Sequence, residues 1–392
     1  MSRKKLSIGA CAAAAMLCQV GAAYAQSSVT LYGIVDAGLM YLSRSTPGFN
    51  GTATSTKSQV SLTNGGYLPS LWGIKGEEDL GGGMKAVFNL ESGFSVGNGG
   101  HDSPANNSLF NRLAYVGLKG GFGTLSAGLQ YSPFFNAMYD LDPRGVAQFG
   151  SVLTPLLDNS LVAAIIMPNA VSYTTPNLGG FEASGLFGLG GVAGSFQNGR
   201  SYSLSARYTN GTVLLTTAYL SVNNALNPTL PPDIFPLLLA NVRAWTAGGS
   251  YKFGSLTVKA SFTNFRANEG GQPTTVSSTN TNVNLYSAGA DYFVLPQLDV
   301  NLGMYYQDDR VNSGVHSLTA ALGAQYLLSR RTALYAQVGL VHNTCSANGT
   351  CLGSGLTVES LGSGVGAMKP IGNAGLPAGT TFGANVGMRV MF

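Results

Sequence analysis

The chain ends with the segment TFGANVGMRVMF, which runs from Thr381 to Phe392. Its even-numbered positions are almost all large and apolar, whereas the odd-numbered ones are small, polar or charged, apart from Met391. Because successive side chains of a β-strand point to opposite sides of a sheet, this period of two predicts a strand with one apolar face. A wall strand of a lipid-embedded barrel has this pattern.

The other end of the chain has the features of an export signal. A basic start, MSRKK, precedes an apolar stretch from Leu6 to Val20, and small residues follow at Ala23 and Ala25. We expect a Sec signal peptide over residues 1–25, removed after Ala25, and a mature chain over residues 26–392. A transmembrane anchor is the weaker alternative, because the stretch is short and ends in a cleavage pattern.

The composition favours a barrel in a membrane. Charged residues make up 10% of the chain, against about 25% in an ordinary soluble domain. The mature chain is close to neutral and has no basic run, so we expect no nucleic-acid partner. It also lacks the roughly 18 consecutive apolar residues of a helical span, which leaves a closed barrel as the membrane fold. Together with the terminal Phe392, typical of such barrels, these features predict the bacterial outer membrane.

Sixteen segments with this alternation follow one another, and every second connection is short. Longer loops are expected at roughly 132–168, 222–243, 268–282 and 343–379. The pattern predicts an all-β fold, a 16-stranded antiparallel transmembrane β-barrel with a water-filled lumen. A soluble β-sandwich or propeller is disfavoured, because many segments carry Gly, Ser, Thr, Asn and Gln on their second face. The predicted strands are 29–42, 71–80, 84–94, 112–119, 124–131, 170–178, 181–189, 201–208, 212–220, 245–253, 256–265, 285–293, 298–307, 318–328, 332–342 and 381–392.

Chemistry-bearing residues are sparse. Cys345 and Cys351 stand in the short segment CSANGTC, and in an oxidising compartment we expect a disulfide between them rather than a metal site. The three histidines, His101, His316 and His342, are too scattered for a catalytic or metal constellation. We therefore expect no catalytic, cofactor-binding or metal residues.

Alternation also assigns charged side chains to the lumen. Counting from Trp72 and along three later strands, the candidate lumen-wall residues are Lys75, Glu77, Lys85, Glu91, Lys252, Lys259 and Arg389. Arg112 is instead expected at a rim or an interface, because it shares the face of Ala114 and Val116.

Several blocks of the sequence resemble the trimeric general porins of Gram-negative bacteria, in the branch typical of β-proteobacteria. The resemblance implies a homotrimer and an inward-folded third loop. It also implies contact with outer-membrane lipid and lipopolysaccharide, and Phe392 as a C-terminal assembly signal for the barrel-assembly machinery. The implied function is an outer-membrane porin for ion transport and passive diffusion of small hydrophilic solutes. The matching blocks are SSVTLYGIVDAG (27–38), WGIKGEEDLGGGMKAVFNLESGF (72–94), FNRLAYVGLKGGFGTLSAGLQY (110–131), NAVSYTTPNLGGF (169–181) and LGAQYLLSRRTALYAQVG (322–339).

By this resemblance, the third loop runs from about Ser132 to Pro168 and narrows the pore. Its charged residues, the candidate constriction set, are Asp140, Asp142, Arg144 and Asp158. In such porins a wall arginine cluster faces the loop. Here Leu71, Leu129 and the segment 165–168 are apolar where the family often has arginine. We therefore expect weaker anion selectivity than is usual in this branch, up to a mild cation preference.

Two questions stay open at the level of sequence. The apolar run from Leu153 to Met167 either makes the constriction of the pore more apolar or packs the loop against the wall, in part as a short helix. The barrel could also serve as an enzyme scaffold or as a surface receptor through its long loops. No readable nucleophile–base grouping favours the enzyme, and surface exposure alone explains the loop at 343–379.

Overall fold

The computed structural model describes residues 28–45, 57–102, 108–160, 165–223, 239–269, 281–346, 355–356 and 378–392. The predicted signal peptide and Cys351 lie outside these ranges. Within them, no helix combines the length and the apolar character needed to cross a membrane.

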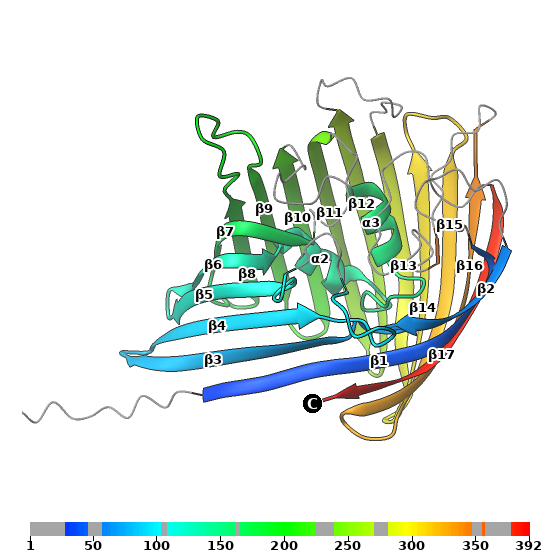
Figure 1. The fold of residues 1–392 in the computed structure, drawn as a ribbon, viewed down its shortest axis with the longest axis horizontal. Helices are drawn as coiled ribbons and strands as arrows, with labels where there is room; N and C mark the ends of the chain where they lie inside the picture. The colour runs from blue at the N-terminus through cyan, green and yellow to red at the C-terminus, as the bar shows by residue number, and fades with distance from the viewer. Residues whose placement is uncertain are drawn as a thin grey trace, which may run out of the picture.

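The described strands form one antiparallel sheet that closes on itself (Figure 1). Two short helices, α2 (Pro133–Leu141) and α3 (Leu153–Ser160), lie between β6 and β7. The strands are β1 (Ser28–Ser45), β2 (Lys57–Asn64), β3 (Leu71–Gly81), β4 (Met84–Gly93), β5 (Leu113–Gly120), β6 (Gly123–Tyr131), β7 (Ile166–Thr174), β8 (Phe181–Gly188), β9 (Ser201–Thr209), β10 (Val213–Asn223), β11 (Leu239–Phe253), β12 (Leu256–Glu269), β13 (Thr281–Leu295), β14 (Leu298–Asp309), β15 (His316–Leu327), β16 (Thr332–Thr344) and β17 (Gly379–Met391).

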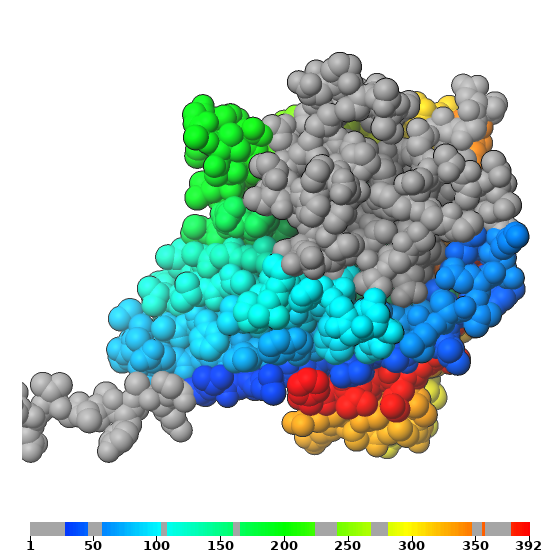
Figure 2. Space-filling model, in the orientation of Figure 1, coloured from blue at the N-terminus to red at the C-terminus, as the bar shows by residue number. Residues whose placement is uncertain are grey.

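Closure depends on β1. One edge of β1 pairs with β17, and the other pairs with β2 over one part and β3 over the rest. Since β2 and β3 continue each other along that edge, the sheet is a barrel of sixteen wall positions, which confirms the predicted fold. The seam ends at Phe392, whose backbone N–H donates to the Gly33 carbonyl and whose carbonyl accepts from the Gly33 N–H, both at 3.1 Å. Figure 2 shows β17 lying along β1 at this seam.

The terminal strand alternates as its sequence predicts. Phe382, Val386 and Met388 are 48%, 53% and 49% exposed, whereas Asn385 and Arg389 are buried on the other face. The outward face of the wall farther around the barrel carries an aromatic row across β11 to β14, in which successive ring centroids lie 5.0, 5.1 and 6.4 Å apart. Such a row is typical of the interfacial girdle of a membrane barrel; its members are Trp245, Phe262, Tyr286 and Tyr306.

The segment between β6 and β7 folds into the barrel, and its helices pack against the inner face of β9 to β13 (Figure 1). Ser132 caps α2 by accepting a hydrogen bond from the Phe135 N–H at 2.9 Å, and Pro133 opens the helix. Phe134 and Met138 then face the wall, as does Leu156 from α3. The described part of the apolar run therefore packs the loop against the wall as a short helix, which decides that open question.

A charged residue introduced on the outward face of β17 tests which face of this strand lies against lipid. The substitution Val386→Arg should lower the free energy of unfolding in lipid by about 2–4 kcal/mol, because it places a cation in the middle of a lipid-facing strand. Denaturant titration of the barrel refolded in vesicles measures the change. Val311 is similarly exposed but lies outside the strands, so Val311→Arg is the matched control and should change stability little. Equal effects of the two substitutions would contradict the assigned face.

Candidate functional site

The register of β3 and β4 with β1 gives one wall of the lumen. Lys75 and Glu77 pair with Thr30 and Ser28 of β1, on the face opposite to the exposed Leu31. Lys85 joins them on this face and forms an ion pair with Glu77 at 2.8 Å. The Nζ of Lys75 lies 5.2 Å from the centre of the Tyr32 ring. This wall is thus a mixture of charges that are paired or held over an aromatic ring.

Glu91, also on this inward face, is the centre of a buried polar cluster. It accepts hydrogen bonds from Arg112 Nε at 2.9 Å and from the hydroxyls of Tyr32 and Tyr131 at 2.9 and 3.1 Å. Arg112 also forms an ion pair with Asp102 at 3.4 Å. The outward face expected for Arg112 is therefore wrong, because its position just before β5 lets the side chain turn inward to the Glu91 carboxylate.

Leu71 and Leu129 stand where the resembling family often has wall arginines, and their surroundings differ. Leu71 is buried and pairs with Ile34 and Gly93 on the inward face. Leu129 pairs with Ala114, on the outward face of β5, so it is not a lumen position. The irregularity between Gly128 and Gln130 interrupts the alternation there, so the lumen position that the family resemblance implied for this residue is not found.

Two charged residues of the inward loop anchor it rather than line the pore. Asp142 and Arg144 are each 1% exposed. Asp142 accepts hydrogen bonds from the Tyr305 hydroxyl and the Val146 N–H. Burial raises the pKa of the Asp142 carboxyl, while the Tyr305 hydrogen bond and the nearby Lys259 act in the opposite direction. The prediction that Asp142 and Arg144 line the pore constriction is therefore wrong, because both side chains are buried.

Arg144 reaches the wall at two strands. Its guanidinium donates to Asn301 Oδ1 at 2.8 Å, to Gln337 Oε1, and to the Phe149 carbonyl at 3.1 Å. Lys259, a predicted lumen-wall residue, donates to the carbonyls of Asp140 and Asp142 at 2.9 Å each. The loop is thus fixed to β12, β14 and β16 by charged donors.

A second inward segment, residues 65–70 between β2 and β3, supports the loop. The carboxylate of Asp36 accepts hydrogen bonds from the N–H groups of Gly66, Tyr67 and Leu68, and from the Tyr335 hydroxyl at 2.6 Å. The Tyr67 carbonyl then accepts from the N–H of a loop residue, Gln148, at 2.9 Å. The alternation pattern does not predict this segment, although its Gly-Gly pair and its proline are ordinary signals of a strand break.

The remaining predicted residues lie as follows. The ring of Tyr67 lies 5.5 Å from the guanidinium of Arg389, which faces inward and is nearly buried. Lys252 is exposed on the inward face of β11, beside the turn to β12. Asp158 is half-buried on α3. Cys345 is disulfide-bonded, and its predicted partner Cys351 lies outside the described residues.

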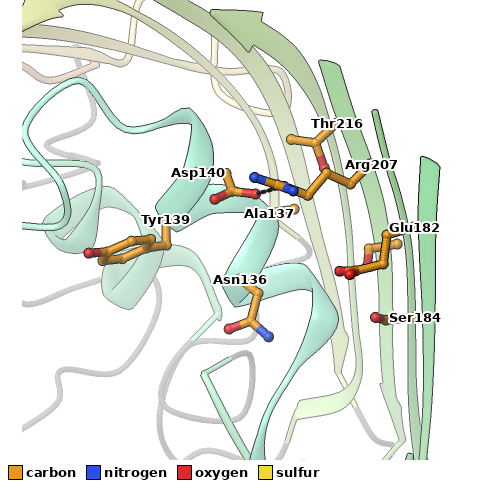
Figure 3. A pocket seen from close by; sticks show the side chains of 9 residues that line it. Asn136, Ala137, Tyr139, Asp140, Glu182, Ser184, Arg207 and Thr216 are labelled. Atoms are coloured by element: carbon orange, nitrogen blue, oxygen red, sulfur yellow. Dashed lines mark hydrogen bonds and ion pairs between the residues drawn. The ribbon is translucent and has the colours of Figure 1, made fainter. Parts of the chain in front are cut away.

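A pocket of about 310 Å³ lies between α2 and the wall, hereafter the α2 pocket (Figure 3). Arg207 of β9 donates from Nε to Asp140 Oδ2 at 2.8 Å across it. Glu182 of β8 pairs in register with Arg207 and so stands beside it. The lining residues are Asn136, Ala137, Tyr139 and Asp140 from α2, and Glu182, Ser184, Ser205, Arg207 and Thr216 from the wall. In the described part of the chain, no group of three His, Cys, Asp or Glu residues could hold a metal ion.

Comparison with known proteins agrees with this geometry. The family model for Gram-negative porins matches residues 10–346. An outer membrane porin protein of Bordetella pertussis is 31% identical over 88% of this chain and 97% of its own length. Outer membrane porin protein 32 of Delftia acidovorans is 32% identical over 84% of this chain and 88% of its own length. The solved anion-selective porin from Comamonas acidovorans superposes with a TM-score of 0.73, at 25% identity, over 94% of this chain and all of that one.

The anchoring role of Arg144 predicts a stability effect. Arg144→Met should lower the free energy of unfolding by about 2–4 kcal/mol, because it removes a charged donor and leaves buried acceptors without a partner. It should also increase open-channel current noise, since the loop loses its attachment to β14 and β16. Arg310 is exposed and pairs with Asp308 at 2.9 Å; Arg310→Met is the control and should leave both measurements unchanged. An Arg144→Met variant with unchanged unfolding free energy and unchanged current noise would show that the loop is held by its apolar face alone.

Proposed function

The chain belongs to the Gram-negative porin family, and on that premise we propose that its pore discriminates only weakly between anions and cations. The protein is an outer-membrane porin, a β-barrel channel for the passive diffusion of solutes. Its selectivity then depends on the charges that the lumen presents to water. The observation that carries the proposal is the pairing of those charges.

Pairing is evident on both sides of the pore. On the wall of β3 to β5, Lys85 is bound to Glu77, and Arg112 to Glu91. On the loop side, the carboxylate of Asp140 is bound to Arg207. Compensated pairs produce a much weaker field across the lumen than a cluster of one sign would. At physiological salt, screening over about 8 Å weakens the remaining field further.

The solved relative from Comamonas acidovorans is described as anion-selective. We propose a weaker anion preference for this chain, for two reasons. Position 71, on the inward wall, is leucine and buried, and Arg144 of the loop is used as an anchor. The arginines that face the lumen near the loop, Arg112 and Arg207, each have a carboxylate partner.

Further proposals concern maturation and assembly. We propose removal of residues 1–25, a homotrimer, and contact with lipopolysaccharide and other outer-membrane lipid. The barrel-assembly machinery would recognise the terminal segment that ends in Phe392. Supporting these proposals are the apolar outward face of β17 and the position of Phe392 at the seam. Conductance steps in groups of three and a trimer band on native gels would test the homotrimer; single steps and a monomer band would contradict it.

Single-channel recording under a potassium chloride gradient tests the selectivity. The reversal potential of the wild type should lie near zero. Lys75→Glu should shift it toward cation preference, because Lys75 is exposed on the lumen wall. Arg243 is exposed on the outward face of β11, on the side of Trp245, so Arg243→Glu makes the same charge change outside the pore and should shift it little. A wild-type potential that strongly favours chloride would reject weak selectivity.

A further inference from the structure

We propose that the α2 pocket is a solute subsite that prefers small compounds carrying an ammonium group. This inference deepens the proposed function and rests on the channel being open to solutes. It starts from the cavity between α2 and strands β8 to β10, where charged and polar side chains from the loop and the wall converge (Figure 3). The pocket lies between α2 and the wall, and the buried anchors Asp142 and Arg144 are not among its lining residues.

The charges of the α2 pocket do not balance. Arg207 stands between two carboxylates, Asp140 at 2.8 Å and its register partner Glu182. The ion pair with Asp140 neutralises one of the two. Among the residues that the structure describes, the Glu182 carboxylate has no hydrogen-bond or ion-pair partner. The pocket therefore presents one uncompensated carboxylate to a solute, beside an ion pair.

The neighbours of Glu182 suit an ammonium group. An ammonium has three N–H donors and no acceptor, so it needs several oxygen atoms around it. Glu182 supplies a carboxylate, Asn136 an amide oxygen, and Ser184 and Ser205 hydroxyls.

Arg207 gives the pocket a second recognition element. Within the described residues its sole hydrogen-bond partner is Asp140, which it reaches through Nε. The two terminal amino groups of the guanidinium can then donate to a carboxylate or hydroxyl of the same solute. A volume of about 310 Å³ corresponds to roughly ten water molecules at ~30 Å³ each. These features fit a solute of amino-acid size, whereas a purely anionic solute would meet two carboxylates.

Block of the single-channel current by L-lysine tests the proposal, with glutarate, a dicarboxylate that has no ammonium group, as the anionic probe. L-lysine should reduce the wild-type current at lower concentration than glutarate does. Glu182→Gln should raise the half-blocking concentration of L-lysine about three- to fivefold, which corresponds to roughly 0.6–1 kcal/mol for a partly exposed charge. Glu78→Gln removes the same charge from an exposed side chain on the outward face of β3 and is the matched control, with no change expected.

A second variant reverses the preference. Asp140→Asn removes the partner of Arg207, so block by glutarate should strengthen. Equal effects of Glu182→Gln and Glu78→Gln, or equal block of the wild type by both probes, would overturn the subsite. Conductance in potassium chloride alone separates the two proposals: a channel that conducts but shows no preference for L-lysine disproves the subsite only, whereas a barrel that does not conduct disproves the open channel.

Discussion

The pairing of backbone N–H and C=O groups is the constraint on which the rest of this structure depends. In a bilayer these groups have no water to bind, so each strand must find partners on both edges. The reciprocal hydrogen bonds between Gly33 and Phe392 complete that pairing at the seam. Once the sheet is closed, its outer face must be apolar and its inner face can be polar, which produces the period of two along every wall strand.

Closure also explains the buried charges inside the barrel. A loop that enters the lumen brings polar backbone with it, and the wall has to satisfy it. Lys259 and Arg144 donate to carbonyl and amide oxygens, and the Asp36 carboxylate accepts three N–H groups from the segment 65–70. Charges that are buried in such hydrogen bonds contribute little to the field in the pore. Selectivity is therefore left to charged residues that remain in contact with water, such as Asp140 of the loop and Arg207 of the wall.

Alternation in the sequence was sufficient to predict sixteen of the described strands, the barrel and the inward face of residues such as Lys75 and Arg389. It missed β2 and the segment 65–70 that follows it. The family resemblance, in turn, placed Leu129 on the lumen wall, where the irregularity beside Gly128 leaves it on the outward face. It also could not reveal that Arg144 is an anchor. Its partners Asn301 and Gln337 are 157 and 193 residues away along the chain, and only the closed sheet brings them to the loop.

Thiol accessibility tests most directly the claim that one side of α2 faces the pore and the other is sealed against the wall. Tyr139 is half-exposed and Leu141, two positions along, is buried. In single-channel recordings of Tyr139→Cys, a charged water-soluble thiol reagent should lower the conductance in discrete steps, while Leu141→Cys should stay unmodified under the same conditions. Equal modification of both variants, or modification of Leu141→Cys alone, would contradict the account.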